Sequence, residues 1–303
     1  MNSQTPLPPP APLCIPDFGF CGAPVVELEM LPTMAGPGEV IFFGVDREFS
    51  RKFGIHNPGA ATFIRERTAV MMPWAEVSPI KGYDIGIITA AEVNTAVRET
   101  RALSCHLARQ GWRPALIGCD HTASLINLLG AIEGSGTVPI YLTFDAHYDI
   151  GRHNPQAGTH NSNFVDVLLA SDKVSRVINV GGRSWSTFVS IYDMVPRFTS
   201  IPGGPQRMSA AEVIERLYWL QDRPLYVSID ADVLDPSGAP NACSPEPFGL
   251  SADDLHTICH WIGSCCRVIG ADLCELVPSD ASACSEQVLM SCLQALFGEA
   301  REK

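Results

Sequence analysis

The sequence predicts an α/β fold, with a parallel sheet that is covered by helices on both faces. Short apolar runs of strand length alternate along the chain with segments of helical periodicity. This alternation is typical of units in which helices cross over between parallel strands. The 303 residues contain no internal repeat and no second apolar core, so we expect one large domain preceded by a tail.

The expected elements follow one another in a regular order. Strands are predicted at 39–44, 83–88, 115–118, 140–144, 176–181, 197–201, 224–230 and 267–272. Helices are predicted after the loop that begins at 57, and at 91–110, 122–132, 164–170, 209–220, from 251 and at 281–298. Ser209 and Glu212 have the spacing of a capping box, and Ser251 is the expected cap of the next helix.

Residues 1–33 are expected to form a disordered, proline-rich tail. The stretch from Thr5 to Leu13 is polyproline-like and cannot form a helix or a central strand. The ordered domain is expected to span 34–303, and Met34 is a candidate alternative start.

Composition argues against several classes of partner. The chain has 33 acidic and 21 basic residues, a net charge of −12, which disfavours nucleic acid and anionic membrane surfaces. It has no apolar run of roughly 18 residues and no signal-peptide pattern. The eleven scattered cysteines lack paired CxxC spacing, so we expect a cytoplasmic protein in which most of them are small buried side chains.

Acidic and imidazole side chains follow three of the predicted strands. Asp145, His147 and Asp149 take alternate positions after 140–144, which would place them on one face of an extended chain. His121 follows the strand at 115–118, and a pair of acids, Asp230 and Asp232, ends the strand at 224–230.

These six side chains are candidate metal ligands, because open α/β sheets place their sites at the carboxyl ends of strands. Six ligands, four of them carboxylates, exceed the four that one tetrahedral zinc usually takes, and they suit a two-metal site. A solvated strand end would explain any one cluster alone, but three such clusters favour metal.

Four segments resemble the ureohydrolases, the family of arginase and agmatinase. Gly118–Thr122, Asp145–Asp149 and Ser228–Pro236 are similar to the family patterns GGDHS, DAHxD and S(I/F)DxDxxDP, and Asp272–Pro278 is similar to DxxExxP. The likeness runs in order from about Gly44 to the C-terminus, which makes it far more specific than one short motif.

The resemblance implies a three-layer α/β/α domain with an eight-stranded parallel sheet, assembled as a homo-oligomer, a trimer or a hexamer. It implies two Mn²⁺ ions per chain and hydrolysis of a guanidino C–N bond in a small substrate. A guanidino carbon is a poor electrophile, so attack requires hydroxide, and ionising water near neutral pH is chemistry that a pair of bound cations supplies. Oxygen-rich ligation suits manganese better than copper or zinc.

The resemblance also implies roles for individual residues. Asp149 would orient the attacking group and pass its proton to the leaving nitrogen. Glu275 would pair with the substrate guanidinium, the alternative being an exposed acid at a strand end. His160 matches a loop histidine that shuttles protons, the alternative being a surface histidine. Ser244 belongs to the segment that lines the metal cleft in the family, and we expect it to contact substrate.

Cysteine replaces a family glycine at Cys119 and again at Cys243. Both side chains are expected to point into crowded space near the ions, where they could tune the site or form a disulfide. Two inert buried thiols are the alternative.

Other departures concern the substrate. The groups with which arginase holds the α-carboxylate and the α-amine have no counterpart in 151–160 and 184–186. These departures disfavour arginase itself. The paired cysteines, with a core that begins near Met34, resemble the branch of the family that converts Nω-hydroxy-L-arginine to hydroxyurea and L-ornithine in D-cycloserine biosynthesis.

Three other functions stay open. An agmatinase or guanidino-acid hydrolase, which releases urea, would share the whole site. A zinc deacetylase would use one zinc with two acids and one histidine, and would leave His121 and the extra aspartates without a role. A non-catalytic regulator would have no need of the intact ligands.

Overall fold

The computed structural model describes residues 13–78, 81–151, 158–184, 195–205, 207–280 and 284–298. Some expectations fall outside these ranges. They concern most of the polyproline-like run, the middle of the loop at 151–163, residues 185 and 186, and the start of the closing helix at 281–283.

One eight-stranded sheet runs through the described part of the chain, in the order β2-β1-β3-β8-β7-β4-β5-β6. Every neighbouring pair is parallel, as predicted. The strands are β1 (Val40–Val45), β2 (Gly82–Ile88), β3 (Arg113–Ile117), β4 (Ile140–Phe144), β5 (Arg176–Val180), β6 (Phe198–Ile201), β7 (Pro224–Asp230) and β8 (Arg267–Cys274).

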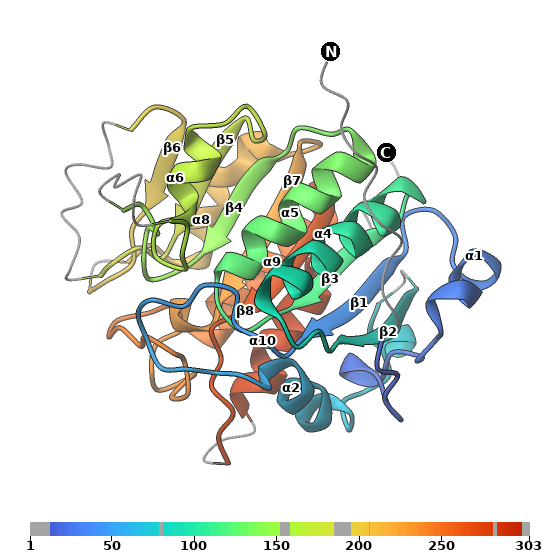
Figure 1. Ribbon diagram of the computed structural model, residues 1–303. Helices are drawn as coiled ribbons and strands as arrows, with labels where there is room; N and C mark the ends of the chain where they lie inside the picture. Colours follow the sequence, from blue (N-terminus) through green and yellow to red (C-terminus); the bar gives the residue numbers. More distant parts are fainter. Residues whose placement is uncertain are drawn as a thin grey trace.

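Helices cover both faces of this sheet, which confirms the predicted fold class (Figure 1). The helices are α1 (Leu31–Met34), α2 (Ala60–Thr68), α3 (Trp74–Val77), α4 (Val93–Arg109), α5 (Thr122–Ser135), α6 (Phe164–Leu169), α8 (Ala210–Leu217), α9 (Ala252–Cys265) and α10 (Cys284–Ala295). Short 3₁₀ turns lie at Phe20–Gly22, Leu28–Met30, Tyr218–Leu220 and Ala231–Val233. Helices α4, α5 and α6 lie on one face, and α2, α8, α9 and α10 on the other.

The predicted caps are present at two helix starts. The Ser209 hydroxyl accepts a hydrogen bond from the backbone N–H of Glu212, whose carboxylate binds the Ser209 backbone in return. Ser251 accepts a bond from the N–H of Asp254 in the same manner. Both caps satisfy backbone donors that the first turn leaves free.

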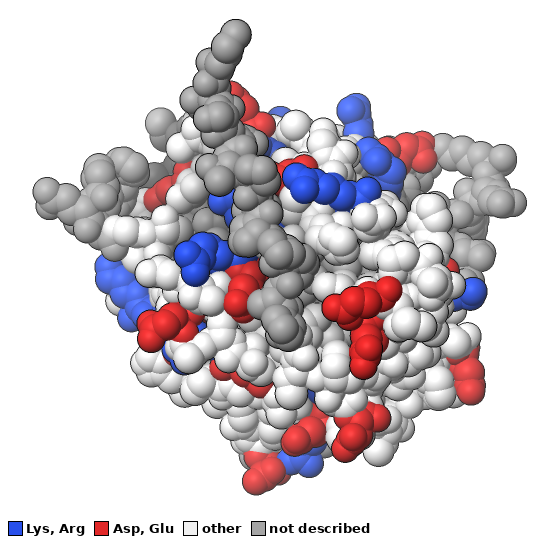
Figure 2. Space-filling view, turned by 45° about the vertical axis from the view of Figure 1, so that its right-hand side comes forward, with Lys and Arg blue, Asp and Glu red and all other residues white. Residues whose placement is uncertain are grey.

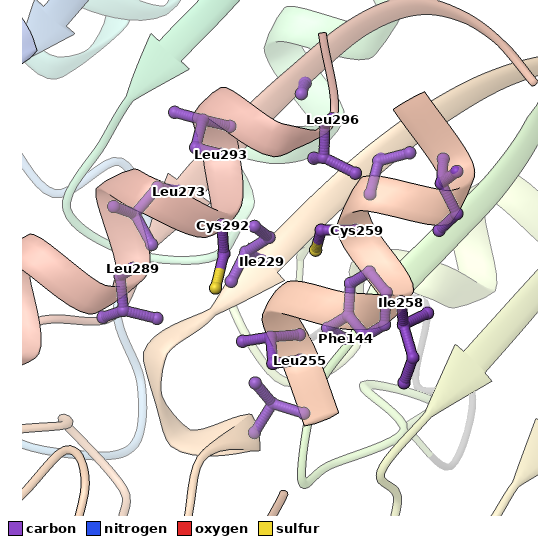
Figure 3. Close-up of a cluster of buried hydrophobic side chains, with 14 of the residues drawn as sticks. Phe144, Ile229, Leu255, Ile258, Cys259, Leu273, Leu289, Cys292, Leu293 and Leu296 are labelled. Atoms are coloured by element: carbon purple, nitrogen blue, oxygen red, sulfur yellow. The ribbon is translucent and has the colours of Figure 1, made fainter. Parts of the chain in front are cut away.

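The largest core cluster packs α9 and α10 against the middle of the sheet (Figure 3). Phe144, Ile229 and Leu273 project from the strands and meet side chains of the two helices. Cys259 and Cys292 are fully buried among them as free thiols, in line with the expectation for most cysteines.

The N-terminal segment corrects the sequence prediction, because residues 13–33 pack on the sheet instead of forming a tail. Cys14 pairs antiparallel with Ile87 of the edge strand β2, and the N–H of Val26 donates to the Asp84 carbonyl. Phe20 is completely buried, under the guanidinium of Arg65 at 4.0 Å from its ring centre. The proline-rich composition of the first residues hid the apolar anchors that follow them.

Figure 2 shows acidic and basic side chains distributed among uncharged residues over one face of the molecule. Among the described residues, no helix is long and apolar enough to cross a membrane.

Replacing Phe20 tests the packing of the N-terminal segment. Phe20→Ala should lower the free energy of unfolding by about 3–5 kcal/mol, because the side chain leaves a cavity under Arg65. Phe18→Ala is the matched control, since Phe18 is 44 % exposed, and should change stability by less than about 0.5 kcal/mol. Urea unfolding measures both variants, and equal effects would contradict the packing described here.

Candidate metal centre

The candidate ligands lie at the carboxyl ends of three strands in the middle of the sheet, β3, β7 and β4. In the sheet order, β3, β8, β7 and β4 are successive neighbours. His121 follows β3, Asp230 ends β7 and Asp232 follows it, and Asp145 begins the segment after β4. Parallel strands present their carboxyl ends at one edge, so residues far apart in sequence converge there.

The six residues, together with Cys274, form three overlapping groups, and within each group the ligand atoms lie within 4.8 Å of one another. The groups are His121 with Asp145 and Asp149, His121 with Asp230 and Cys274, and His147 with Asp145 and Asp232.

His121 is at the centre of this arrangement. Its Nδ1 atom lies 3.0 Å from Asp149 Oδ2, 3.1 Å from Asp230 Oδ2 and 3.2 Å from Asp145 Oδ2. On the other side of Asp145, His147 Nδ1 lies 2.9 Å from Asp232 Oδ2.

Hydrogen bonds from backbone N–H groups orient three of the aspartates. In Asp145, Asp230 and Asp232, the Oδ1 atom accepts a backbone N–H at 2.6–3.0 Å. The Oδ2 atom of each is therefore left to face an imidazole nitrogen of the cluster.

The sequence predicted that Asp145, His147 and Asp149 share one face of an extended chain, and the structure differs from this prediction. The strand ends at Phe144, and the chain bends at Ala146 and His147. Asp149 is in the left-handed region, at a φ of 49°, which few non-glycine residues adopt. A bent backbone, and not an extended strand, brings Asp149 beside His121.

The electrostatics of the cluster call for a cation. Burial, with the nearby charge of Asp145, raises the pKa of Asp149 to about 7. Burial and Asp232 raise the pKa of Asp230 well above its ordinary value. His121 Nδ1 and Asp145 Oδ2 are buried and make no hydrogen bond, although each faces the other across 3.2 Å. Four buried carboxylates beside unbonded ligand atoms fit a metal centre, because a bound cation would compensate their charge.

A buried polar chain supports His121 from behind. His121 Nε2 lies 2.9 Å from the Ser228 hydroxyl, which donates to Asp272 Oδ1 at 2.7 Å. The hydroxyls of Ser124 and Tyr226 also donate to Asp272. With Nε2 held in this way, the ring presents Nδ1 to the carboxylates, as is usual for metal-binding histidines.

Glu275 lies at the edge of this cluster with both carboxylate oxygens engaged. Its Oε1 atom accepts the backbone N–H of His121 at 2.7 Å, and its Oε2 atom pairs with Arg51 Nη1 at 2.7 Å. The residue is 4 % exposed and has a φ of 64°. It is thus buried beside the metal cluster and is not a solvated strand-end acid.

His160 and Ser244 flank the loop between β1 and α2. His160 is 9 % exposed, its Nδ1 lies 3.0 Å from the Ser162 hydroxyl, and its Nε2 lies 3.5 Å from Lys52 Nζ. Burial and the Lys52 charge lower its pKa. Ser244 faces Gly54, where a Cβ would come within 2.6 Å of the Ser244 hydroxyl.

Cys119 and Cys243 are separate free thiols, so the structure contains the buried thiols that were the alternative to a disulfide. The Cys119 sulfur points to the carbonyl of Val45, at 3.3 Å, because the residue lies where β1 and β3 run side by side. Cys243 instead lies beside Glu275, and its N–H donates to the Glu275 carbonyl at 2.8 Å. Among the described residues, Cys243 belongs to none of the three groups of candidate metal ligands. Burial raises the pKa of both thiols.

Three site residues were not predicted. Cys274 directly precedes Glu275 in its motif and groups with His121 and Asp230. Glu246 lies 3.7 Å from His147 Nε2, and Arg51 pairs with Glu275. The position of Cys274 inside the fourth motif was a usable signal, whereas the other two contacts depend on loops that only the fold brings together.

Comparison with known proteins places similar sequences in one family of hydrolases. The model of the Arginase family matches residues 45–296. A formimidoylglutamase of Nocardia farcinica is 26% identical over 255 residues, which cover 80% of this chain and 81% of that protein. An agmatinase of Chromobacterium violaceum is 29% identical over 177 residues, 56% of this chain and 52% of that protein.

Solved structures share the fold. Proclavaminate amidino hydrolase from Streptomyces clavuligerus superposes with a TM-score of 0.77 at 18% identity, covering 93% of this chain and 96% of that one. Formimidoylglutamase from Bacillus subtilis gives a TM-score of 0.74 at 18% identity, covering 95% and 93%. Because the family model matches most of this chain, from residue 45 to residue 296, the chain belongs to the arginase family of hydrolases.

Proposed function

We propose that this chain is a two-manganese amidinohydrolase that converts Nω-hydroxy-L-arginine and water to hydroxyurea and L-ornithine. The observation that carries the hydrolytic part is the convergence of six ligands on the carboxyl ends of adjacent strands. The enzyme would act on a small substrate in the cytoplasm, as a trimer or hexamer.

One cation would be held by His121, Asp145, Asp149 and Asp230, and the second by Asp145, His147 and Asp232. The pair of cations supplies the ionisation of water near neutral pH. Asp149, whose Oδ2 lies 3.0 Å from His121 Nδ1, would accept the proton of the attacking water and return it to the leaving nitrogen. His160, in the loop between β4 and α6, would exchange that proton with solvent.

The choice of substrate rests on what surrounds the ligands. The α-amine and α-carboxylate contacts of arginase are missing from the sequence, and cysteines stand at two family glycine positions. These features favour a modified guanidine over arginine itself. Ser244, on the segment that faces Gly54, is the proposed contact for the substrate chain.

A formimidoylglutamase activity is the second candidate, because a relative of that name is similar over 80% of this chain. Agmatine is a third substrate to include, since an agmatinase is also similar. All three reactions would use the same ligands, so only turnover separates them.

A panel of substrates tests the proposal. The manganese-loaded protein should release hydroxyurea from Nω-hydroxy-L-arginine with a kcat/KM at least about tenfold above those for L-arginine, agmatine and formimidoylglutamate, a margin worth about 1.4 kcal/mol. Hydroxyurea, urea and formamide are quantified by chromatography after equal incubation. A higher kcat/KM for another member of the panel would reassign the substrate, and no turnover of any of them would reject the hydrolase.

Removing Asp232 tests the two-metal assignment. Asp232→Ala should retain about one manganese per chain where the wild type holds about two, and should lose nearly all activity, because both cations are needed to ionise water. Elemental analysis after gel filtration measures the metal. Asp253→Ala, at an exposed acid of α9, is the control and should match the wild type. Full activity in Asp232→Ala would contradict the assignment.

The unfolding temperature of the metal-free protein should fall between pH 7 and pH 9. Burial alone would lower the pKa of His147, but Asp232 and Asp145 raise it to about 12. The stabilisation from its bound proton is therefore complete below the unfolded pKa of about 6.5 and is lost as the pH rises toward 12. Asp149 acts in the same sense at lower pH, because burial and Asp145 raise its pKa from 3.8 to about 7 and the stabilisation from its bound proton is lost between these two values.

Manganese should remove this loss, because ligands must release their protons to bind it. Scanning calorimetry at several pH values, with chelator or with manganese, measures both effects. The metal-free variant His147→Asn should show a flatter profile. A wild-type unfolding temperature that rises from pH 7 to pH 9 without metal would overturn the prediction.

A further inference from the structure

The guanidinium of Arg51 is surrounded by hydrogen-bond acceptors beside the metal cluster. It pairs with Glu275 at 2.7 Å and with Glu48, and it donates to Asn57 Oδ1 at 2.8 Å and to the Phe53 carbonyl at 3.1 Å. The Arg51 side chain is only 2 % exposed, although the next five residues are exposed. A buried arginine side chain directly before a run of five exposed residues points to a role at the site it enters.

Glu275 joins the loops that build this end of the site. Its carboxylate receives the N–H of His121 and the guanidinium of Arg51. Its backbone N–H donates to the Cys119 carbonyl, and its carbonyl accepts the Cys243 N–H, both at 2.8 Å. The loop between β1 and α2 (Figure 1) is therefore tied to the loops after β3, β7 and β8 through one residue.

We propose that Arg51 is a positioning residue, which fixes the Glu275 carboxylate for the substrate and, through Glu275, fixes the metal ligand His121. This proposal rests on the proposed function and adds a component to it. A carboxylate has about four acceptor positions, and three are used here, by the His121 N–H, the Arg51 guanidinium and the Cys243 thiol. We assign the remaining position to an N–H group of a guanidine or amidine.

An alternative is that the Arg51 guanidinium fills the position of the substrate beside Glu275 and must leave before substrate binds. The contacts of Arg51 argue against this alternative. Three of its four acceptors, on Glu48, Phe53 and Asn57, belong to its own loop. Asn57 is itself fixed, since its Nδ2 donates to the carbonyls of Cys119 and Leu276. Departure of Arg51 would break all these bonds and leave a buried carboxylate without its counter-charge, which is unfavourable.

Lysine cannot replace this arrangement. Its single ammonium could keep the ion pair with Glu275, but it lacks the planar fork that reaches acceptors on several sides at once. Arg51→Lys therefore separates the charge of Arg51 from its geometry, and Arg51→Ala removes both.

The test compares Arg51→Ala and Arg51→Lys with the wild type, using the substrate that the wild type hydrolyses best. Arg47→Ala is the matched control, because Arg47 lies in the same loop and its guanidinium donates to the Ala90 carbonyl, away from the metal cluster. Three quantities are measured: kcat and KM, manganese affinity of the metal-free protein by titration calorimetry, and activity with added methylguanidinium.

Arg51→Ala should lose about 10–100-fold in kcat/KM and should bind manganese more weakly by a similar factor, as is typical when a partner of a metal ligand is removed. Methylguanidinium should restore activity to Arg51→Ala and should not raise the activity of the wild type. Arg51→Lys should be intermediate in kcat/KM, and Arg47→Ala should match the wild type.

Wild-type kcat/KM in Arg51→Lys would overturn the proposal, even if Arg51→Ala failed to fold. So would an Arg51→Ala variant that is more active than the wild type, since Arg51 would then be an obstruction. A folded Arg51→Ala with reduced activity, unchanged manganese affinity and no response to methylguanidinium would also overturn it. If the wild type hydrolysed no guanidino or formimidoyl compound, the proposed function would fail instead, while the manganese titrations would still measure the link from Arg51 to His121.

Discussion

The mutual repulsion of four buried carboxylates is the constraint on which this structure depends. Asp145, Asp149, Asp230 and Asp232 lie close together with almost no access to solvent. Such a group of like charges is unfavourable unless positive charge is placed among them. The fold provides a fixed frame for that charge, because four adjacent strands end at one edge and short backbone bonds aim the Oδ2 atoms of three of the acids inward.

The candidate ligands could be selected from the sequence because each cluster directly follows an apolar strand. Their mutual arrangement could not be predicted, since it depends on the strand order, which places β8 and β7 between β3 and β4. The extended chain that we predicted after β4 is wrong, because Asp149 lies in the left-handed region. Arg51 and Glu275 are 224 positions apart, and no local pattern connects them.

Most of the architecture was predictable for similar reasons. Helix starts such as that at Ser209 are determined by residues three positions apart, so the capping box was visible in the sequence. The packing of residues 13–33 was not, because prolines dominate the composition of the first residues and the apolar anchors are few. Phe20 finds its partners, Asp84 and Arg65, only after β2 and α2 are in place.

The pairing of Cys14 with Ile87 covers an edge of the sheet at which a second molecule could otherwise add a strand. β2 is the outermost strand on its side of the sheet, and Ile87 both donates to and accepts from the Cys14 backbone. Farther along the strand, the Asp84 backbone is engaged by Pro24 and Val26. An uncovered edge strand would offer these groups to a second molecule, which is a common route to aggregation. The N-terminal segment thus shields the sheet against unwanted strand addition, a protection that depends on its lying along β2.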